Sequence, residues 1–134
     1  MWLCGILAVL VAGCIAPDVP VERADLLSVP EGSFAGPDAY CDFTNGSYLR
    51  IVIQNQGQED APATSTRVSF SPGGTTTIPT PPVRAGQRVI LSPVKIPSAC
   101  FDPDCDFKIT MDAWGQAIEY NEENNIADGR CIRP

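Results

Sequence analysis

Acidic side chains gather in the last third of the sequence, where their spacing could suit a cation. Eight of the sixteen Asp and Glu residues lie within residues 99–128. Asp102, Asp104 and Asp106 place carboxylate oxygens at alternating positions, which a hard cation such as Ca²⁺ can bind. The segment lacks the glycine and the distant bidentate glutamate of an EF-hand loop. We therefore expect a solvated acidic loop and keep a calcium site as the alternative.

Catalytic residues are scarce in the sequence. It contains no His, which excludes His-based triads and most catalytic zinc sites. Ser92 and Lys95 have the spacing of a known nucleophile motif, but they fall at the end of an expected strand rather than at the start of a helix. The net charge of −7 would repel a phosphate backbone. We predict a protein that is not an enzyme, needs no cofactor and does not bind nucleic acid.

The first 16 residues are typical of an export signal that ends at a lipidated cysteine. They carry no charged side chain, and the apolar run Leu3–Ala12 is too short to span a bilayer of about 30 Å as a helix. The run ends in VAGC at positions 11–14, which resembles the bacterial lipobox. The resemblance implies that residues 1–13 are removed as a signal peptide and that Cys14 carries acyl chains. An ordinary signal peptide cut near Ala16, or a buried apolar segment, are the alternatives.

Lipidation at Cys14 implies a membrane-anchored place in the bacterial cell envelope. Because Ile15 rather than an aspartate follows the cysteine, the outer membrane is favoured in a cell that has two membranes. Residues 14–37 contain several prolines and no hydrophobic period, so we expect a semi-extended tether. Within it, Leu26 and Leu27 could form a short first strand.

From residue 38 to the C-terminus, short apolar runs alternate with turn signals. Apolar and polar side chains alternate with a period of two, and we expect strands over residues 47–54, 66–71, 87–94 and 107–113 and near 125–132. No window has the period of an amphipathic helix, and 13 Pro and 11 Gly act against long helices. We therefore predict an all-β domain over residues 38–134, folded as an antiparallel β-sandwich of five to seven short strands.

The predicted core lies between the two layers of this sandwich. Its expected members are Leu49, Ile51, Ile53, Val68, Phe70, Val89, Leu91, Phe107, Ile109, Met111 and Ile126. Trp114 follows the 107–113 strand, and we expect it to cap the core, with an exposed aromatic contact as the alternative.

Four cysteines remain if Cys14 is acylated and the signal peptide is removed. They are Cys41, Cys100, Cys105 and Cys131, and an even number in an exported chain predicts disulfides. In an antiparallel sandwich all four positions fall at the same end of the domain. Pairing of neighbouring strands favours Cys41–Cys100 with Cys105–Cys131, and the competing arrangement is Cys100–Cys105 with Cys41–Cys131.

Three short motifs together point to one family. Asn55-Gln56-Gly57 follows a strand, Ala85-Gly86 precedes a strand, and the strand ending in Asp112 is followed by Glu119 and an Asn/Glu run over residues 121–125. The combination resembles the CARDB module, an Ig-like domain of bacterial envelope proteins named for a proposed link to cell adhesion. The resemblance covers about residues 38–132. It implies an Ig-like sandwich of about seven strands with a non-catalytic role in adhesion.

The family's typical opening, Pro-Asp-Leu, has a degenerate counterpart in Ala24-Asp25-Leu26 or in Pro37-Asp38-Ala39. Asn and Asp side chains bond to backbone groups in turns, so we expect the Asn/Glu run to fix the corner between two strands. A metal or ligand site made of the same carboxylates is the alternative.

Binding of a protein or glycan partner is the predicted function. We expect the partner on the loops 56–65 and 114–121, with Trp114 and Tyr120 as contacts, because the tether and the disulfides would lie at the opposite pole. A structural spacer or assembly subunit of an envelope complex, or a Ca²⁺-dependent binding module, are the alternatives.

Overall fold

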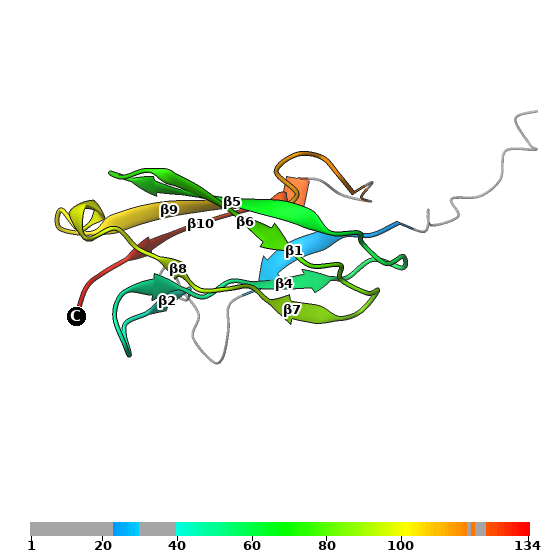
Figure 1. Cartoon of the computed structure of the whole chain (residues 1–134), viewed down its shortest axis with the longest axis horizontal. Helices are drawn as coiled ribbons and strands as arrows, with labels where there is room; N and C mark the ends of the chain where they lie inside the picture. Colours follow the sequence, from blue (N-terminus) through cyan, green and yellow to red (C-terminus); the bar gives the residue numbers. More distant parts are fainter. Residues whose placement is uncertain (1–22, 30–39, 118, 120–122) are drawn as a thin grey trace, which may run out of the picture.

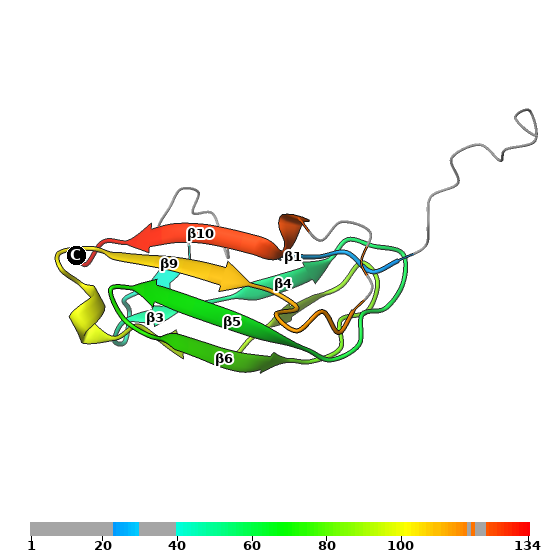
Figure 2. The same cartoon turned by 90° about the horizontal axis from the view of Figure 1, so that it is seen from above.

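The computed structural model describes residues 23–29, 40–117, 119 and 123–134, and these form two layers of antiparallel strands (Figure 1). One layer is a four-stranded sheet in the order β10-β9-β5-β6, whose strands run side by side in Figure 2. Its strands are β5 (Thr64–Ser71), β6 (Thr75–Thr80), β9 (Cys105–Thr110) and β10 (Ile126–Cys131). The all-β sandwich predicted from the period of two is confirmed.

The second layer consists of two three-stranded sheets in the orders β1-β4-β7 and β2-β3-β8. Its strands are β1 (Leu26–Val29), β2 (Cys41–Asp42), β3 (Tyr48–Leu49), β4 (Val52–Asn55), β7 (Arg88–Ile90) and β8 (Val94–Lys95). Short 3-10 turns, η2 (Ser98–Cys100) and η3 (Glu123–Asn125), precede β9 and β10. No helical segment among these described residues is long and apolar enough to cross a bilayer.

Two strands expected to be continuous are each divided in two. The 47–54 strand becomes β3 and β4, and the 87–94 strand becomes β7 and β8. Pro93 has no N–H to donate and interrupts the second of them. The layer stays connected across the break, because Leu91 N donates to Ile51 O at 2.9 Å and Arg50 N donates to Tyr40 O at 2.8 Å.

The sandwich has two ends along its long axis. We call the end that holds the four cysteines the disulfide pole, and the opposite end, with the loops 56–63 and 111–117, the loop pole (Figure 1). β9 starts at the disulfide pole with Cys105 and ends at the loop pole with Thr110.

The sandwich begins earlier in the chain than predicted. β1 pairs antiparallel with β4, Leu26 opposite Asn55 and Val29 opposite Val52, and Leu26 is buried. The tether expected over residues 14–37 is therefore wrong for residues 26–29, where the short first strand considered at Leu26 and Leu27 is found. The signal peptide expected over residues 1–13 and the acylated Cys14 lie outside the described residues.

The interior follows the predicted alternation except at two large side chains. In β5, Thr64, Thr66, Val68 and Phe70 face inward, and nine of the predicted core members are buried. They are Leu49, Ile51, Ile53, Val68, Phe70, Leu91, Phe107, Ile109 and Met111. Val89 is half-buried against the core, whereas Ile126 is 48% exposed.

The prediction for Ile126 is wrong because β10 turns its small residues inward. Ala127 and Gly129 are half-buried and Cys131 is fully buried, while the alternate positions point to solvent. Ala127 stands opposite Ile109 of β9 and Gly129 stands opposite Phe107, so the larger β9 side chains fill the space.

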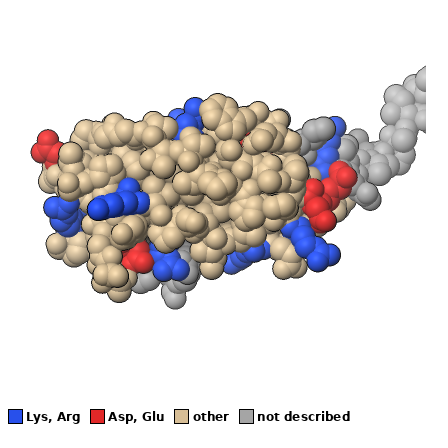
Figure 3. Space-filling view, in the orientation of Figure 1, with Lys and Arg blue, Asp and Glu red and all other residues tan. Residues whose placement is uncertain are grey.

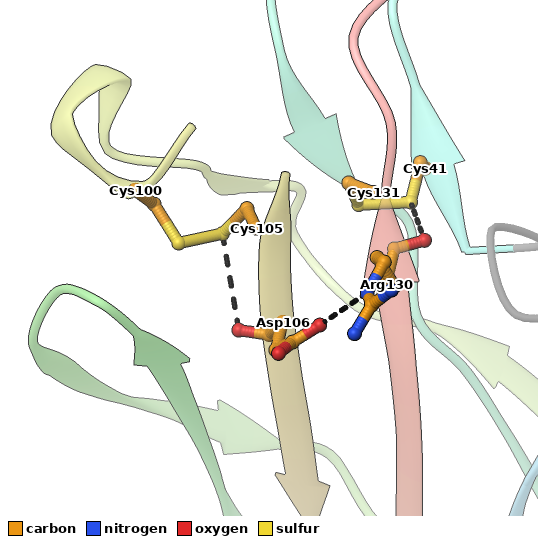
Figure 4. Close-up of polar contacts among 6 residues, drawn as sticks. All are labelled: Cys41, Cys100, Cys105, Asp106, Arg130 and Cys131. Atoms are coloured by element: carbon orange, nitrogen blue, oxygen red, sulfur yellow. Dashed lines mark hydrogen bonds and ion pairs between the residues drawn. A yellow bond between two sulfur atoms is a disulfide. The ribbon is translucent and has the colours of Figure 1, made fainter. Parts of the chain in front are cut away.

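The four cysteines form two disulfides at the disulfide pole (Figure 4). Cys41 of β2 bonds to Cys131 of β10 with a Cα–Cα distance of 5.8 Å, and so joins the two layers. Cys100 of η2 bonds to Cys105 of β9 with a Cα–Cα distance of 5.0 Å. The favoured pairing of Cys41 with Cys100 and Cys105 with Cys131 is therefore wrong, and the competing arrangement is the one found.

The strand order assumed for the favoured pairing is nevertheless correct. Cys105 and Cys131 are direct partners in the β9–β10 register. Both side chains are fully buried and point into the sandwich, where they meet partners on facing elements rather than each other. Cys131 reaches β2 in the other layer, and Cys105 reaches the η2 turn that closes over the pole.

Removal of the two disulfides should have unequal effects on stability. The Cys41–Cys131 bond spans 90 residues and the Cys100–Cys105 bond spans 5. In the chain-entropy account, the first stabilises the fold by about 4–5 kcal/mol and the second by about 2 kcal/mol. We expect Cys41→Ser/Cys131→Ser to lower the free energy of unfolding more than Cys100→Ser/Cys105→Ser, as measured by denaturant titration. Equal losses would contradict this assignment.

Candidate binding surfaces at the two poles

A buried polar network holds the loop pole together. Asn55, the last residue of β4, is fully buried, and its side-chain amide makes four hydrogen bonds. Its Oδ1 accepts from the backbone N–H groups of Asp25 at 3.0 Å and Gly57 at 2.9 Å. Its Nδ2 donates to the carbonyl oxygens of Glu59 at 2.8 Å and Val83 at 2.9 Å. One amide therefore joins the chain before β1, the loop after β4 and the segment before β7.

Two buried carboxylates belong to the same network. Glu119 accepts from Leu26 N at 2.7 Å through Oε1 and from Asn125 Nδ2 at 2.6 Å through Oε2. Asp25 accepts from Asn124 Nδ2 at 2.8 Å and from Gln56 Nε2 at 2.7 Å. Both oxygens of each carboxylate are thus bonded to protein donors, which supports a structural role for the described part of the Asn/Glu run.

Gly57 lets the chain before β1 lie against the loop after β4. A Cβ at this position would stand 2.2 Å from the carbonyl oxygen of Arg23 and 2.6 Å from the backbone nitrogen of Asp25. Both atoms belong to the backbone, so a side chain would push the two segments apart. The Asn-Gln-Gly motif therefore supplies a buried amide, a donor to Asp25 and the space for close approach.

Trp114 projects from a tight turn at the loop pole. Asp112 has a left-handed backbone with φ of 49°, and its carboxylate accepts from the backbone N–H groups of Gln116 at 2.6 Å and Ala117 at 3.1 Å. Met111 takes the last inward position after β9, and the turn directs Trp114 outward, where it is 62% exposed. The guanidinium carbon of Arg67 lies 5.7 Å from the centroid of the Trp114 ring. The prediction that Trp114 caps the core is wrong.

The chain enters the domain at the loop pole. The carbonyl oxygen of Arg23 accepts from Gln58 N at 2.9 Å, and Ala24 forms a parallel bridge with Glu119. Placing the partner on these loops assumed that the tether joins the domain elsewhere, and this assumption is wrong. Tyr120, the second predicted contact, lies outside the described residues.

The three aspartates proposed as calcium ligands do not form a site. Within the described residues, no group of three or more Cys, Asp or Glu side chains could hold a metal ion. Asp102 is exposed, and Asp106 pairs with Arg130 on the neighbouring strand β10 at 2.7 Å (Figure 4). Asp106 raises the pKa of Arg130, mainly through this hydrogen bond. The calcium site is not supported, because β9 points Asp106 sideways toward Arg130 rather than around a cation.

The disulfide pole carries an aromatic and cationic cluster. The Arg133 guanidinium carbon lies 4.1 Å from the centroid of the Phe101 ring, and the Phe43 and Phe101 rings are 6.0 Å apart. Ile132, which precedes Arg133 in the chain, is 53% exposed. A shallow pocket nearby is lined by Asp42, Asn45, Tyr48 and Pro93.

Asp42 organises the β2–β3 turn next to this cluster. Its carboxylate accepts from the hydroxyl of Thr44 and from Thr44 N, the latter at 2.9 Å, and Arg50 lies 3.4 Å away. The Thr44 hydroxyl, followed by the Thr44 backbone N–H, holds the pKa of Asp42 below its ordinary value, and Arg50 adds to this effect against the cost of burial.

A family model described as CARDB matches residues 39–128, which is more than half of the chain. The chain belongs to the CARDB family. The match includes the Asn-Gln-Gly motif, Asp112, Glu119 and the Asn/Glu run. Asn55, Glu119 and the described members of the run meet in the network at the loop pole, and Asp112 holds the turn beside it. β1 precedes the matched segment but pairs with it along its whole length.

Two solved structures share the fold of this CARDB chain. The CARDB domain of the PF1109 protein from Pyrococcus furiosus, described as in complex with di-metal ions, has a TM-score of 0.61 and 18% identity and covers 87% of this chain and 93% of its own. A domain from Methanosarcina acetivorans, described as from a candidate cell surface protein, has a TM-score of 0.65 and 15% identity and covers 84% of this chain and 93% of its own. No curated protein matches the chain.

Loss of the Asn55 amide should destabilise the whole domain. Asn55→Ala removes the buried hydrogen bonds to Asp25 N and Val83 O and the part-buried ones to Gly57 N and Glu59 O, and of these groups Val83 O still accepts from Ala61 N. We expect the free energy of unfolding to fall by about 3 kcal/mol or more. The matched control is Gln54→Ala, which removes one exposed hydrogen bond with Arg88 and should cost less than about 1 kcal/mol. Similar losses in the two variants would refute the role assigned to Asn55.

Acidification should weaken the disulfide pole through Asp42. The pKa of Asp42 is lower in the folded than in the unfolded chain. The ionised carboxylate therefore contributes its full stabilisation of the fold at pH values above the unfolded pKa, and this contribution is lost as the pH falls through the folded pKa. We expect the melting temperature of the unaltered protein to fall more steeply than that of Asp42→Asn below about pH 4. Calorimetric melts over this range test the prediction, with Asp128→Asn as an exposed control. Parallel slopes for the protein and Asp42→Asn would count against it.

Proposed function

We propose that this protein is a lipid-anchored, non-catalytic module of a bacterial cell envelope that binds a protein or glycan partner. Membership of the CARDB family supports a non-catalytic Ig-like module. The VAGC run at positions 11–14 supports acylation at Cys14. Two disulfides among the described residues agree with export to an oxidising compartment.

The position of Arg23 supports a direction of display. Arg23 is held at the loop pole and follows Cys14 by nine positions, so the loop pole is the end nearer to the acyl chains. The disulfide pole then faces away from the membrane. A partner would meet the half-buried rings of Phe43 and Phe101 and the exposed side chains of Ile132 and Arg133, since aromatic and arginine side chains are enriched at binding surfaces.

A second candidate function is that of an assembly subunit in a larger envelope complex. β7 is an edge strand of its sheet, and its Ile90 side chain is 61% exposed. Edge strands can pair with a strand of a partner protein. This function would be favoured over display of the disulfide pole if the protein forms a stoichiometric protein complex that Ile90→Lys dissociates and Arg133→Ala leaves intact.

Intact mass and membrane partition test the anchor. We expect the unaltered protein to begin at Cys14, to carry acyl mass and to sediment with membranes after a high-salt wash, because two or three acyl chains give lasting attachment. Cys14→Ser should lose the acyl mass and the membrane fraction. Cys4→Ser is the matched control, since this position lies within the segment expected to be removed. Membrane retention of an unacylated Cys14→Ser protein would refute the proposed anchor.

A further inference from the structure

The distance between the expected anchor and the loop pole is short. Gln58 N and Glu59 N donate to the Arg23 carbonyl oxygen at 2.9 Å and 3.4 Å, so residue 23 is part of the folded domain. The nine residue steps from Cys14 to Arg23 reach about 30 Å at full extension. The eight residues of β5 alone extend over about 27 Å. The loop pole can therefore contact a membrane that the tether reaches, while the disulfide pole lies a domain length farther away.

Trp114 is the large aromatic side chain that the loop pole exposes. Its 62% exposure is the highest among the large hydrophobic side chains of the described residues. Arg67 stands beside the ring at 5.7 Å. An indole with a neighbouring guanidinium suits the bilayer interface, because the ring combines an apolar body with a polar N–H and the cation can meet lipid phosphate.

Burial of acidic side chains makes this pole less acidic than the whole chain. Asp25, Asp112 and Glu119 are 7%, 6% and 3% exposed; Asp25 and Glu119 are bonded inside the network, and Asp112 accepts from Gln116 N and Ala117 N within its own turn. Arg23 and Arg84 remain exposed together with the acidic Glu59–Asp60 pair, and cationic and anionic side chains alternate at this end in Figure 3. A chain with a net charge of −7 can thus present this end to lipid headgroups without a continuous acidic surface.

We propose that the Asp112–Ala117 turn is a membrane-contacting loop, with the Trp114 indole at the headgroup level of the bilayer that holds Cys14. The inference rests on the proposed lipid anchor, and its partner is the lipid surface itself. Contact at Trp114 gives the domain a second attachment besides the acyl chains and keeps the disulfide pole away from the membrane.

The fluorescence of the mature lipoprotein tests this contact. Trp2 and Trp114 are the only tryptophans, and Trp2 leaves with the signal peptide, so all indole emission of the mature protein comes from Trp114. The purified lipoprotein is reconstituted in phosphatidylcholine vesicles with or without bromine on the upper carbons of the acyl chains. We expect bromine to quench most of the Trp114 emission. In vesicles without bromine, we expect the emission maximum to shift to shorter wavelength and the Trp114 ring to be protected from quenching by aqueous acrylamide.

A matched variant moves the indole to the other pole. Trp114→Phe/Phe101→Trp should keep full emission in brominated vesicles, and its quenching by acrylamide should be the same with and without vesicles, because position 101 is half-buried against the core. Equal quenching in the two proteins, or Trp114 emission that bromine leaves unchanged in a protein of verified acyl mass, would overturn the inference and leave the anchor intact. An unacylated mass would overturn the anchor and the inference together. Shielding of Trp114 that arises only when a protein or glycan is added would also overturn the lipid contact.

Discussion

The side-chain amide of Asn55 has no access to water, and the domain depends on the four hydrogen bonds that this amide makes inside the protein. The partners in these bonds come from three separate parts of the chain: the approach to β1, the loop after β4 and the stretch before β7. A single buried amide with all its bonds made stabilises modestly, but leaving any of those groups unpaired is costly. The network therefore selects one arrangement of the loop pole and excludes others that an apolar cluster would tolerate.

The two ends of the sandwich are held by different means. At the loop pole, the cohesion is entirely non-covalent and depends on carboxylates and amides whose partners are also buried. At the disulfide pole, short strands and a 3-10 turn contribute few ladder bonds, and two disulfides hold them in place. In the chain-entropy account, the two disulfides stabilise the fold by restricting the unfolded chain, and this contribution adds to the packing at the pole where regular structure is sparse. This division leaves the surface residues of both poles free to serve contacts with other molecules.

Much of the fold could be predicted from the sequence, since a period of two in residues 66–71 and 107–113 reflects burial directly. The features that could not be predicted depend on neighbours distant in the chain. A short strand at Leu26 and Leu27 was an open alternative, but β1 is too short to show a period that would place it in the sandwich. Ile126 lies outside the core because β10 turns the half-buried Ala127 and Gly129 inward instead. The family motifs indicated a fixed corner, but not that Asp25, Asn55 and Glu119 converge on one network. The disulfide partners followed from which way the side chains face, which strand order alone does not determine.

The bond between Cys41 and Cys131 also has a mechanical consequence for a protein held at one end. A pulling force applied between an anchored N-terminus and a partner bound at the C-terminal end would pass through this bond and bypass residues 42–130, which lie between the two cysteines. About 300 Å of chain would be shielded from extension in this way. The load would fall instead on β1, along its own axis, so that its hydrogen bonds to β4 would be stressed together in shear. Under tension, the β1–β4 ladder and the bonds of Asp25 and Leu26 to the buried network would be loaded first, ahead of the segment that the disulfide closes.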